Sequence, residues 1–262
     1  LNMTVLPLVG RERETGPEYL TLKEALEEEL LEITEVDEGG SVPELRVRNL
    51  SGGSVLLLDG EELMGAKQNR VLNTSVMVAG QTEVIVPVSC TEQGRWHYKS
   101  AKFEDSGLIM ASKIRGAKSQ SVSSSLKTSN SYCSNQSLVW NEIHDLCKNT
   151  NTLSHTGAMK AAYLQTEDSL ASYREAFPLL SGQRGLMVFI NDRVAGCELL
   201  SRSTAYGQVH TKLLDSFALD AVTDQGGAPG ADAGANADAG HDDHEHEHEE
   251  DTDSVDPSAG MG

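Results

Sequence analysis

Short apolar runs separated by Gly, Asn and Ser follow one another through residues 31–90. Runs of this length that are rich in Val, Leu and Ile predict β-strands, here over residues 31–36, 44–49, 54–58, 71–78 and 83–90. Val76 and Val78 alternate with Ser75 and Met77, which indicates a half-buried strand. The close spacing of the runs favours an antiparallel sheet or sandwich.

Helix-start signals lie on both sides of these strands. Thr21 is followed three residues later by Glu24, the pattern of a capping box, and this predicts a short helix that runs into the strand at 31–36. Residues 166–177 predict a second amphipathic helix, with Thr166 as its cap and Pro178 as its stop.

Two further helices are predicted from apolar positions at helical spacing, over residues 137–148 and 203–222. Residues 185–200 consist of two apolar runs around Asn191 and Asp192. A two-residue turn of this kind predicts a β-hairpin.

Two stretches depart from the regular pattern. Pro87 lies inside the apolar run at 83–90, and because proline cannot donate to a β-ladder, we expect this strand to be an edge strand or to carry a bulge. Residues 99–136 are rich in Ser and basic residues. We expect a long loop there with little regular structure.

These elements predict an α+β fold, in which an antiparallel β-sheet or sandwich assembly packs with several helices and a disordered acidic C-terminal tail follows. We expect a single domain over residues 1–221, which is long enough to bury a core. Residues 222–262 hold 12 Asp and Glu and no Lys or Arg. This segment has too few apolar residues to offset the entropy of ordering, so we expect disorder.

Much of the net charge of −19 lies in this tail, since residues 1–221 carry 28 acidic and 21 basic residues, or −7. An acidic surface repels phosphate backbones and anionic lipids, so neither nucleic acid nor a membrane is an expected partner. No apolar run reaches the roughly 20 residues of a membrane helix. The N-terminal residues lack a signal-peptide pattern, and a cytoplasmic location is expected.

The sequence identifies no cofactor. The four cysteines form no CxxC pair, which argues against a disulfide framework or a Cys-rich zinc site. No glycine-rich dinucleotide motif, P-loop or HExxH motif is present, and no metal site is expected in the folded part. In the tail, residues 241–251 alternate His with acids; this run either holds Zn²⁺, Ni²⁺ or Cu²⁺ loosely or only adds solubility.

Polar side chains gather in two segments next to predicted strands. The first polar segment, residues 59–70, holds Glu61, Glu62, Lys67, Gln68 and Arg70. The second polar segment, residues 90–96, holds Glu92, Gln93, Arg95 and Trp96. The runs at 71–78 and 83–90 predict an antiparallel hairpin, which would bring both polar segments to the same end of the sheet.

These residue types permit two interpretations. In the first they form a site: Glu62 and Glu92 are candidate catalytic residues, since burial can raise the pKa of a glutamate and make it a base. The candidate ligand-binding residues are Gln68, Arg70, Gln93, Arg95 and Trp96, because Arg binds phosphate in a bidentate manner and an indole stacks on a base or sugar. In the second interpretation the arginines pair with neighbouring carboxylates and only tie the two segments together.

The stretches LLLDGEELMGAKQNRVLNTSVMV (56–78) and PVSCTEQGRW (87–96) resemble the bacterial ARG and Rhodanese-Phosphatase-superfamily-associated protein domain. The stretches GLMVFINDRVAGCELL (185–200) and KLLDSFALDA (212–221) are similar to the closing strand–strand–helix unit of that family. The resemblance covers about residues 5–221, but the Ser-rich 119–136 and the tail look unlike the core pattern of the family. Carried over position by position, it selects Glu62, Gln68, Arg70, Glu92, Arg95 and Trp96.

The resemblance implies a role near the processing of ADP-ribose or nucleotide phosphates, without fixing an activity. The function expected on this basis is recognition, or hydrolysis, of an ADP-ribose-like or phosphorylated nucleotide compound between residues 60–70 and 90–97. The alternative is a non-enzymatic interaction or structural module whose polar clusters are ion pairs. Whether the protein is an enzyme, and its oligomeric state, stay open from the sequence.

Overall fold

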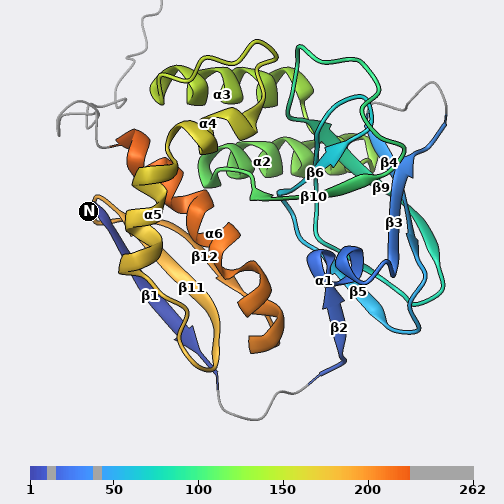
Figure 1. The fold of residues 1–262 in the computed structure, drawn as a ribbon, viewed down its shortest axis with the longest axis horizontal. Coiled ribbons are helices and arrows are strands. Elements are labelled where there is room, and N and C mark those ends of the chain that lie inside the picture. The colour runs from blue at the N-terminus through green and yellow to red at the C-terminus, as the bar shows by residue number, and fades with distance from the viewer. Residues whose placement is uncertain (11–15, 38–42, 225–262) are drawn as a thin grey trace, which may run out of the picture. The chain divides into compact units, whose positions relative to one another are not determined.

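An antiparallel sheet of six strands carries both polar segments (Figure 1). The structure is a computed structural model that describes residues 1–10, 16–37 and 43–224. In spatial order the sheet consists of β10 (Phe103–Ile109), β6 (Glu61–Gly65), β7 (Arg70–Leu72), β9 (Glu83–Cys90), β4 (Glu44–Asn49) and β3 (Leu31–Glu35).

A smaller sheet and a short helix complete the N-terminal half. This sheet contains β2 (Tyr19–Thr21), β5 (Ser54–Leu57) and β8 (Val76–Val78), with β2 parallel to β5 and β8 antiparallel to it. Helix α1 (Leu22–Glu27) starts with the predicted capping box, in which the Thr21 hydroxyl accepts from the Glu24 amide and the Glu24 carboxylate accepts from the Thr21 amide. The apolar face of α1 packs with both sheets in one core cluster.

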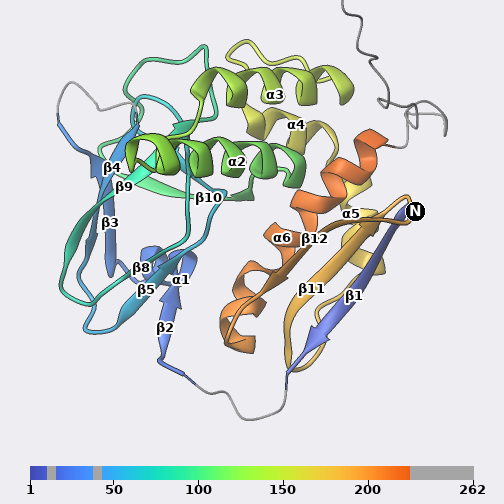
Figure 2. The same cartoon turned by 180° about the vertical axis from the view of Figure 1, so that it is seen from behind.

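A third sheet joins the N-terminal strand to a hairpin that precedes the last helix of the described chain (Figure 2). Its strands are β1 (Met3–Val9), β11 (Gln183–Ile190) and β12 (Arg193–Leu199), all antiparallel. Asn191 and Asp192 have φ of 49° and 61°, as a tight hairpin turn between right-twisted strands requires. Helices α5 (Glu167–Ala176) and α6 (Ser203–Asp224) pack against each other, and α6 packs on β11.

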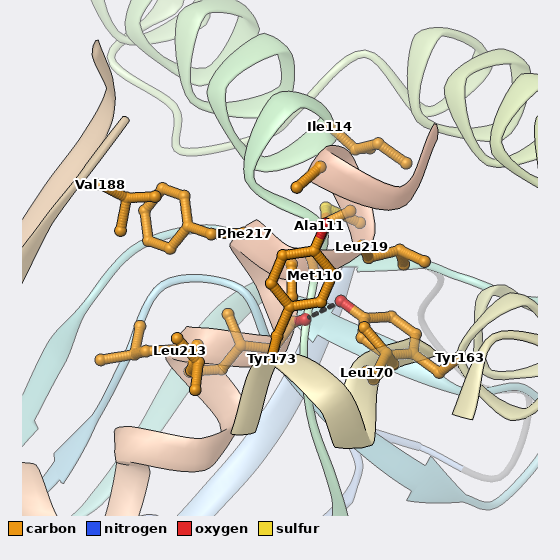
Figure 3. Close-up of a cluster of buried hydrophobic side chains, with 14 of the residues drawn as sticks. Met110, Ala111, Ile114, Tyr163, Leu170, Tyr173, Val188, Leu213, Phe217 and Leu219 are labelled. Atoms are coloured by element: carbon orange, nitrogen blue, oxygen red, sulfur yellow. Dashed lines mark hydrogen bonds between the residues drawn. The ribbon is translucent and has the colours of Figure 1, made fainter. Parts of the chain in front are cut away.

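The second core lies where α6 meets the remaining helices, α2 (Ser112–Ser129), α3 (Gln136–Asn149) and α4 (Met159–Gln165). Figure 3 shows Phe217 of α6 beside Val188 of β11, with Ile114 of α2 nearby. The Tyr163 hydroxyl donates a 2.5 Å hydrogen bond to the Ile109 carbonyl, which satisfies a polar group inside this core. This core reaches the six-stranded sheet, because Val71 of β7 belongs to it.

The α+β fold class is confirmed, and so are most predicted elements. The strands at 31–36, 44–49, 54–58 and 83–90, the hairpin at 185–200 and the helices at 137–148, 166–177 and 203–222 are all present within a few residues. Thr166 precedes α5, but its hydroxyl donates to the Ala162 carbonyl and does not cap the helix. Strand β1 and helix α4 were not anticipated.

The predicted single strand at 71–78 is wrong. Its two ends are separate strands in different sheets, β7 beside β9 and β8 beside β5. The chain leaves the first sheet at Asn73, whose side-chain oxygen accepts a 2.6 Å hydrogen bond from Ser89 and whose amide group donates to the Tyr132 carbonyl. These buried polar contacts, which no apolar pattern reveals, break the strand.

The prediction that the strand at Pro87 is an edge strand or carries a bulge is also wrong, because β9 lies between β7 and β4 and pairs with each without a shift of register. Strand β9 pairs with β4 up to Pro87 and with β7 from Val88 onward. The proline therefore falls at the change of partner, where its missing N–H removes no donor from a continuous ladder.

The long loop predicted over 99–136 is wrong as well, because this stretch contains β10 and the 18-residue helix α2. Ile114 and Val122 are the buried apolar residues of α2, and the side chains of Arg115 and Lys118 are buried beside them. The aliphatic stems of such basic residues supply packing that a hydropathy pattern does not show. Similarly, the first polar segment contains strand β6.

The described chain ends with α6 at Asp224, three residues beyond the predicted end of the domain at 221. The predicted disorder and the His-rich run fall in residues 225–262, outside the described residues. No helix of the described part combines the length and apolar character that a membrane crossing demands.

Candidate functional site

The two polar segments lie side by side, although the hairpin invoked to join them does not exist. Arg70 of β7 is the direct partner of Cys90 in β9. The Thr91 amide donates to the Asn69 carbonyl over 3.1 Å, and the Gln68 side chain donates to the Glu92 carbonyl over 2.9 Å. The β7–β9 ladder thus supplies the convergence that the sequence predicted.

Arg95 fastens the second polar segment to the first. Its Nε donates to the Glu92 carboxylate over 2.6 Å, and Nη2 donates to the Asn69 side chain over 2.9 Å. The remaining contacts go to the carbonyls of Gly65, Ala66 and His97. Every guanidinium nitrogen of this side chain, which is only 6% exposed, is therefore engaged within the protein. A phosphate on Arg95 would have to displace these bonds.

Glu92 links this arrangement to a third segment just before α4. Its second carboxylate oxygen accepts a 2.9 Å hydrogen bond from the Thr156 hydroxyl. Glu92 also forms an isolated β-bridge with Ala158, and the Gly94 amide donates to the Thr156 carbonyl. Both oxygens of the Glu92 carboxylate are thus occupied by structural partners.

Glu62 lies on the opposite face of the six-stranded sheet from Arg70. Glu62 is the direct partner of Val71, whereas Arg70 is the partner of Leu63. Because successive side chains of a strand alternate between faces, Glu62 and Arg70 point in opposite directions. Glu62 is fully buried, accepts a 2.6 Å hydrogen bond from Thr91, and has its pKa raised by burial, an effect that the Thr91 hydrogen bond opposes.

Arg70 is held on its own face by only part of its guanidinium. Nη1 donates to the Gln68 side-chain oxygen and to the Cys90 sulfur, each over 2.8 Å. Nη2 lies 3.9 Å from Oε1 of Glu35, close enough for charge attraction and too far for a hydrogen bond. Among the described residues, Arg70 Nε and Nη2 and both Glu35 oxygens have no hydrogen-bond partner.

These four atoms are buried: Arg70 is 0% exposed, and the Glu35 side chain is 6% exposed. Unpaired buried polar atoms of this kind are rare in folded proteins, since each costs on the order of 1–3 kcal/mol. Cys90 beside them is a neutral thiol, because burial raises its pKa to about 11.

Trp96 adjoins the cluster formed by Glu35, Arg70 and Cys90, and it is 51% exposed. The centroid of its ring lies 5.8 Å from the Arg70 guanidinium carbon and 5.5 Å from the Lys67 ammonium, distances at which cations are attracted to a ring face. Gln93 is exposed and contributes its carbonyl, which accepts a long 3.4 Å hydrogen bond from Gln68.

Two members of the cluster were not among the predicted site residues. Cys90 ends the predicted strand at 83–90, and its position opposite Arg70 follows once β7 and β9 pair. Glu35 belongs to β3, at the far edge of the sheet in the order of strands. Its charge within the strand pattern of 31–36 was the only available signal, and a charged residue in a strand usually faces solvent.

The described residues contain no group of three or more His, Cys, Asp or Glu that could hold a metal ion. The guanidinium edge of Arg70 and the carboxylate of Glu35 can form hydrogen bonds and charge interactions with a ligand. The indole of Trp96 adds an aromatic ring face.

The fold and site define an α+β domain in which two polar segments close around a buried Arg–Glu pair. The chain belongs to the family described as the ARG and Rhodanese-Phosphatase-superfamily-associated Protein domain, whose model matches residues 1–260. No curated protein and no solved structure gives a significant match to the chain. The family name records a phosphatase-superfamily-associated context and states neither a ligand nor a reaction.

Proposed function

We propose that this domain recognises a phosphorylated nucleotide-type ligand, for which ADP-ribose is the model compound, at the cluster of Glu35, Arg70 and Trp96. The observation that carries the proposal is the Nε–Nη2 edge of Arg70, which is buried beside a half-exposed indole and has no hydrogen-bond partner among the described residues. A guanidinium edge binds oxygen pairs with defined geometry, and an indole stacks on a base or sugar. The ligand reaches Arg70 by displacing the Trp96 ring from the guanidinium.

The other predicted site residues support this cluster in different ways. Gln68 orients Arg70 through its side-chain oxygen, and Glu92 with Arg95 fixes the segment that ends in Trp96. Gln93 is an exposed residue of that same segment. Glu62 has the raised pKa that a general base needs, but it faces away from Arg70. Recognition is therefore better supported than hydrolysis at this cluster.

The alternative, a non-enzymatic interaction or structural module, draws its support from Arg95 and Glu92. Their contacts are those of a structural ion pair with all polar atoms satisfied. Under this alternative Arg70 and Glu35 would form a second, incompletely satisfied structural ion pair, and no ligand would be needed.

Thermal denaturation with a panel of ADP-ribose, NAD, nucleotides and sugar phosphates separates the two functions. A ligand that binds only the folded state raises the melting temperature, by an amount that corresponds to about 2.7 kcal/mol at a concentration 100 times Kd. We expect such a shift for wild type and its loss in Arg70→Lys, which keeps the charge and removes the bidentate edge. Arg48→Lys, at an exposed position, is the matched control. No shift with any compound contradicts the proposal.

Catalysis is tested separately by product formation. Incubation of the wild-type protein with the compound that gives the largest shift, followed by chromatography, detects hydrolysis. If product forms, Glu62→Gln and Glu92→Gln identify which carboxylate is required. Binding without product identifies a recognition domain.

A further inference from the structure

The atoms of Arg70 and Glu35 that lack hydrogen-bond partners among the described residues are two donors and two acceptors. Arg70 offers two donors, Nε and Nη2, on one edge of its guanidinium, and Glu35 offers two acceptors, Oε1 and Oε2. The two groups face each other across 3.9 Å between Nη2 and Oε1. A group that satisfies both sides has to accept from the guanidinium and donate to the carboxylate.

Among the groups of a nucleotide-type ligand, hydroxyls have this property. A phosphate oxygen accepts from Arg70 but has no proton for Glu35, whose charge would repel it. An ammonium donates to Glu35 but is repelled by Arg70. A hydroxyl has both a donor and two acceptor lone pairs, and two adjacent hydroxyls supply two of each.

We propose that the Glu35–Arg70 pair is the subsite for the vicinal diol of a ribose. One hydroxyl accepts from Nε and the other from Nη2, and each donates to one oxygen of Glu35. This inference rests on the proposed function, and it assigns Arg70 to the sugar of the ligand, where the sequence had assigned that arginine to phosphate. The phosphate groups then extend away from Glu35.

The neighbouring residues fit a sugar better than an anion. The Cys90 sulfur accepts from Nη1, and Gln68 fixes the same nitrogen, so the Nε–Nη2 edge is the one that is left for a ligand. Cys90 is a neutral thiol with its pKa raised to about 11 by burial, so it adds no charge. The indole of Trp96 would cover the apolar face of a sugar ring, as aromatic side chains do with amphipathic ligands.

Calorimetric titration of ADP and 2′-deoxy-ADP into the full chain tests the subsite. We expect ADP to bind about 10- to 100-fold more tightly than 2′-deoxy-ADP, because the missing hydroxyl leaves a buried donor and acceptor unpaired. In Glu35→Gln this preference should shrink to within about threefold, since one acceptor oxygen is replaced by a donor. Glu83→Gln, with a side chain 49% exposed, should keep the wild-type preference.

The outcomes are distinguishable. Equal binding of ADP and 2′-deoxy-ADP to wild type overturns the diol subsite and leaves the proposed function standing. Binding of neither compound, nor of any other member of the panel, overturns both. If Glu35→Gln does not fold, judged by circular dichroism, Arg70→Lys replaces it, and a preference for ADP that survives in that variant overturns the subsite.

Discussion

The two polar segments contain two buried arginines that differ in how completely the protein satisfies them. Arg95 uses all three guanidinium nitrogens on a carboxylate, a side-chain amide and backbone carbonyls. Arg70 donates hydrogen bonds from one nitrogen, and its other two have no hydrogen-bond partner among the described residues. From the sequence alone, both arginines are equally plausible ligand-binding residues. The structure separates them by the number of guanidinium nitrogens that already donate hydrogen bonds within the protein.

Replacing Arg95 should have the largest effect on stability. Arg95→Met removes five hydrogen bonds, three of them to the first polar segment, and leaves Glu92 buried without its counter-ion. We expect a loss of about 3–5 kcal/mol in the free energy of unfolding, measured by urea denaturation. Arg48→Met is the exposed control. A loss below about 1 kcal/mol would show that Arg95 does not hold the two polar segments together.

Arg70 should behave differently when it is replaced together with Glu35. We expect Arg70→Met to cost about 1–3 kcal/mol, because it leaves Glu35 buried alone. The double variant Glu35→Met/Arg70→Met should recover most of that loss, since an apolar pair replaces an incompletely satisfied ion pair. Denaturation of both single variants and the double variant gives the coupling energy. Additive losses would contradict the account.

Glu62 gives a test on the other face of the sheet. Burial raises its pKa above the usual value of 4.5, so the folded protein holds this proton more tightly than the unfolded chain. That contribution to stability is complete below about pH 4.5 and is lost as pH rises through the raised pKa. Glu62→Gln should therefore gain stability relative to wild type as pH increases from about 4 to 8. A difference that does not change with pH contradicts the prediction.

Trp96 should have the smallest effect on folding. Its ring is half exposed, and a cation–π contact at such a site is worth about 0.5–1 kcal/mol. We expect Trp96→Ala to lower the free energy of unfolding by less than about 1 kcal/mol while weakening ADP-ribose binding at least about tenfold. Trp140→Phe controls for the other tryptophan. Unchanged affinity in Trp96→Ala would remove the indole from the site.

The sequence predicted the fold class because it depends on local patterns, whereas the convergence of the polar segments was predicted from a hairpin that is absent and is produced by the β7–β9 ladder. Capping at Thr21, the turn at Asn191 and the apolar runs of the strands are readable from neighbouring residues. The roles of the two arginines depend on contacts between distant positions. Arg70 meets Glu35, 35 residues earlier in the chain, only after β3 has joined the sheet through β4 and β9.

The errors have the same origin. The apolar pattern of the sequence does not predict helix α2, because its buried side chains include Arg115 and Lys118. Other parts of the chain supply the ion-pair partners of these two residues. The division of residues 71–78 between two sheets depends on the contacts of Asn73 with Ser89 and Tyr132. Neither set of partners is adjacent in sequence, so hydropathy alone does not place them.

Arg70, and not Arg95, is the arginine that we assign to the ligand. Calorimetric titration of ADP-ribose into wild type and Arg70→Lys tests this most directly, with melting temperature recorded for each protein. We expect saturable binding to wild type and at least about tenfold weaker binding to a folded Arg70→Lys variant, because the bidentate edge is gone. Equal affinity in the two folded proteins would contradict it.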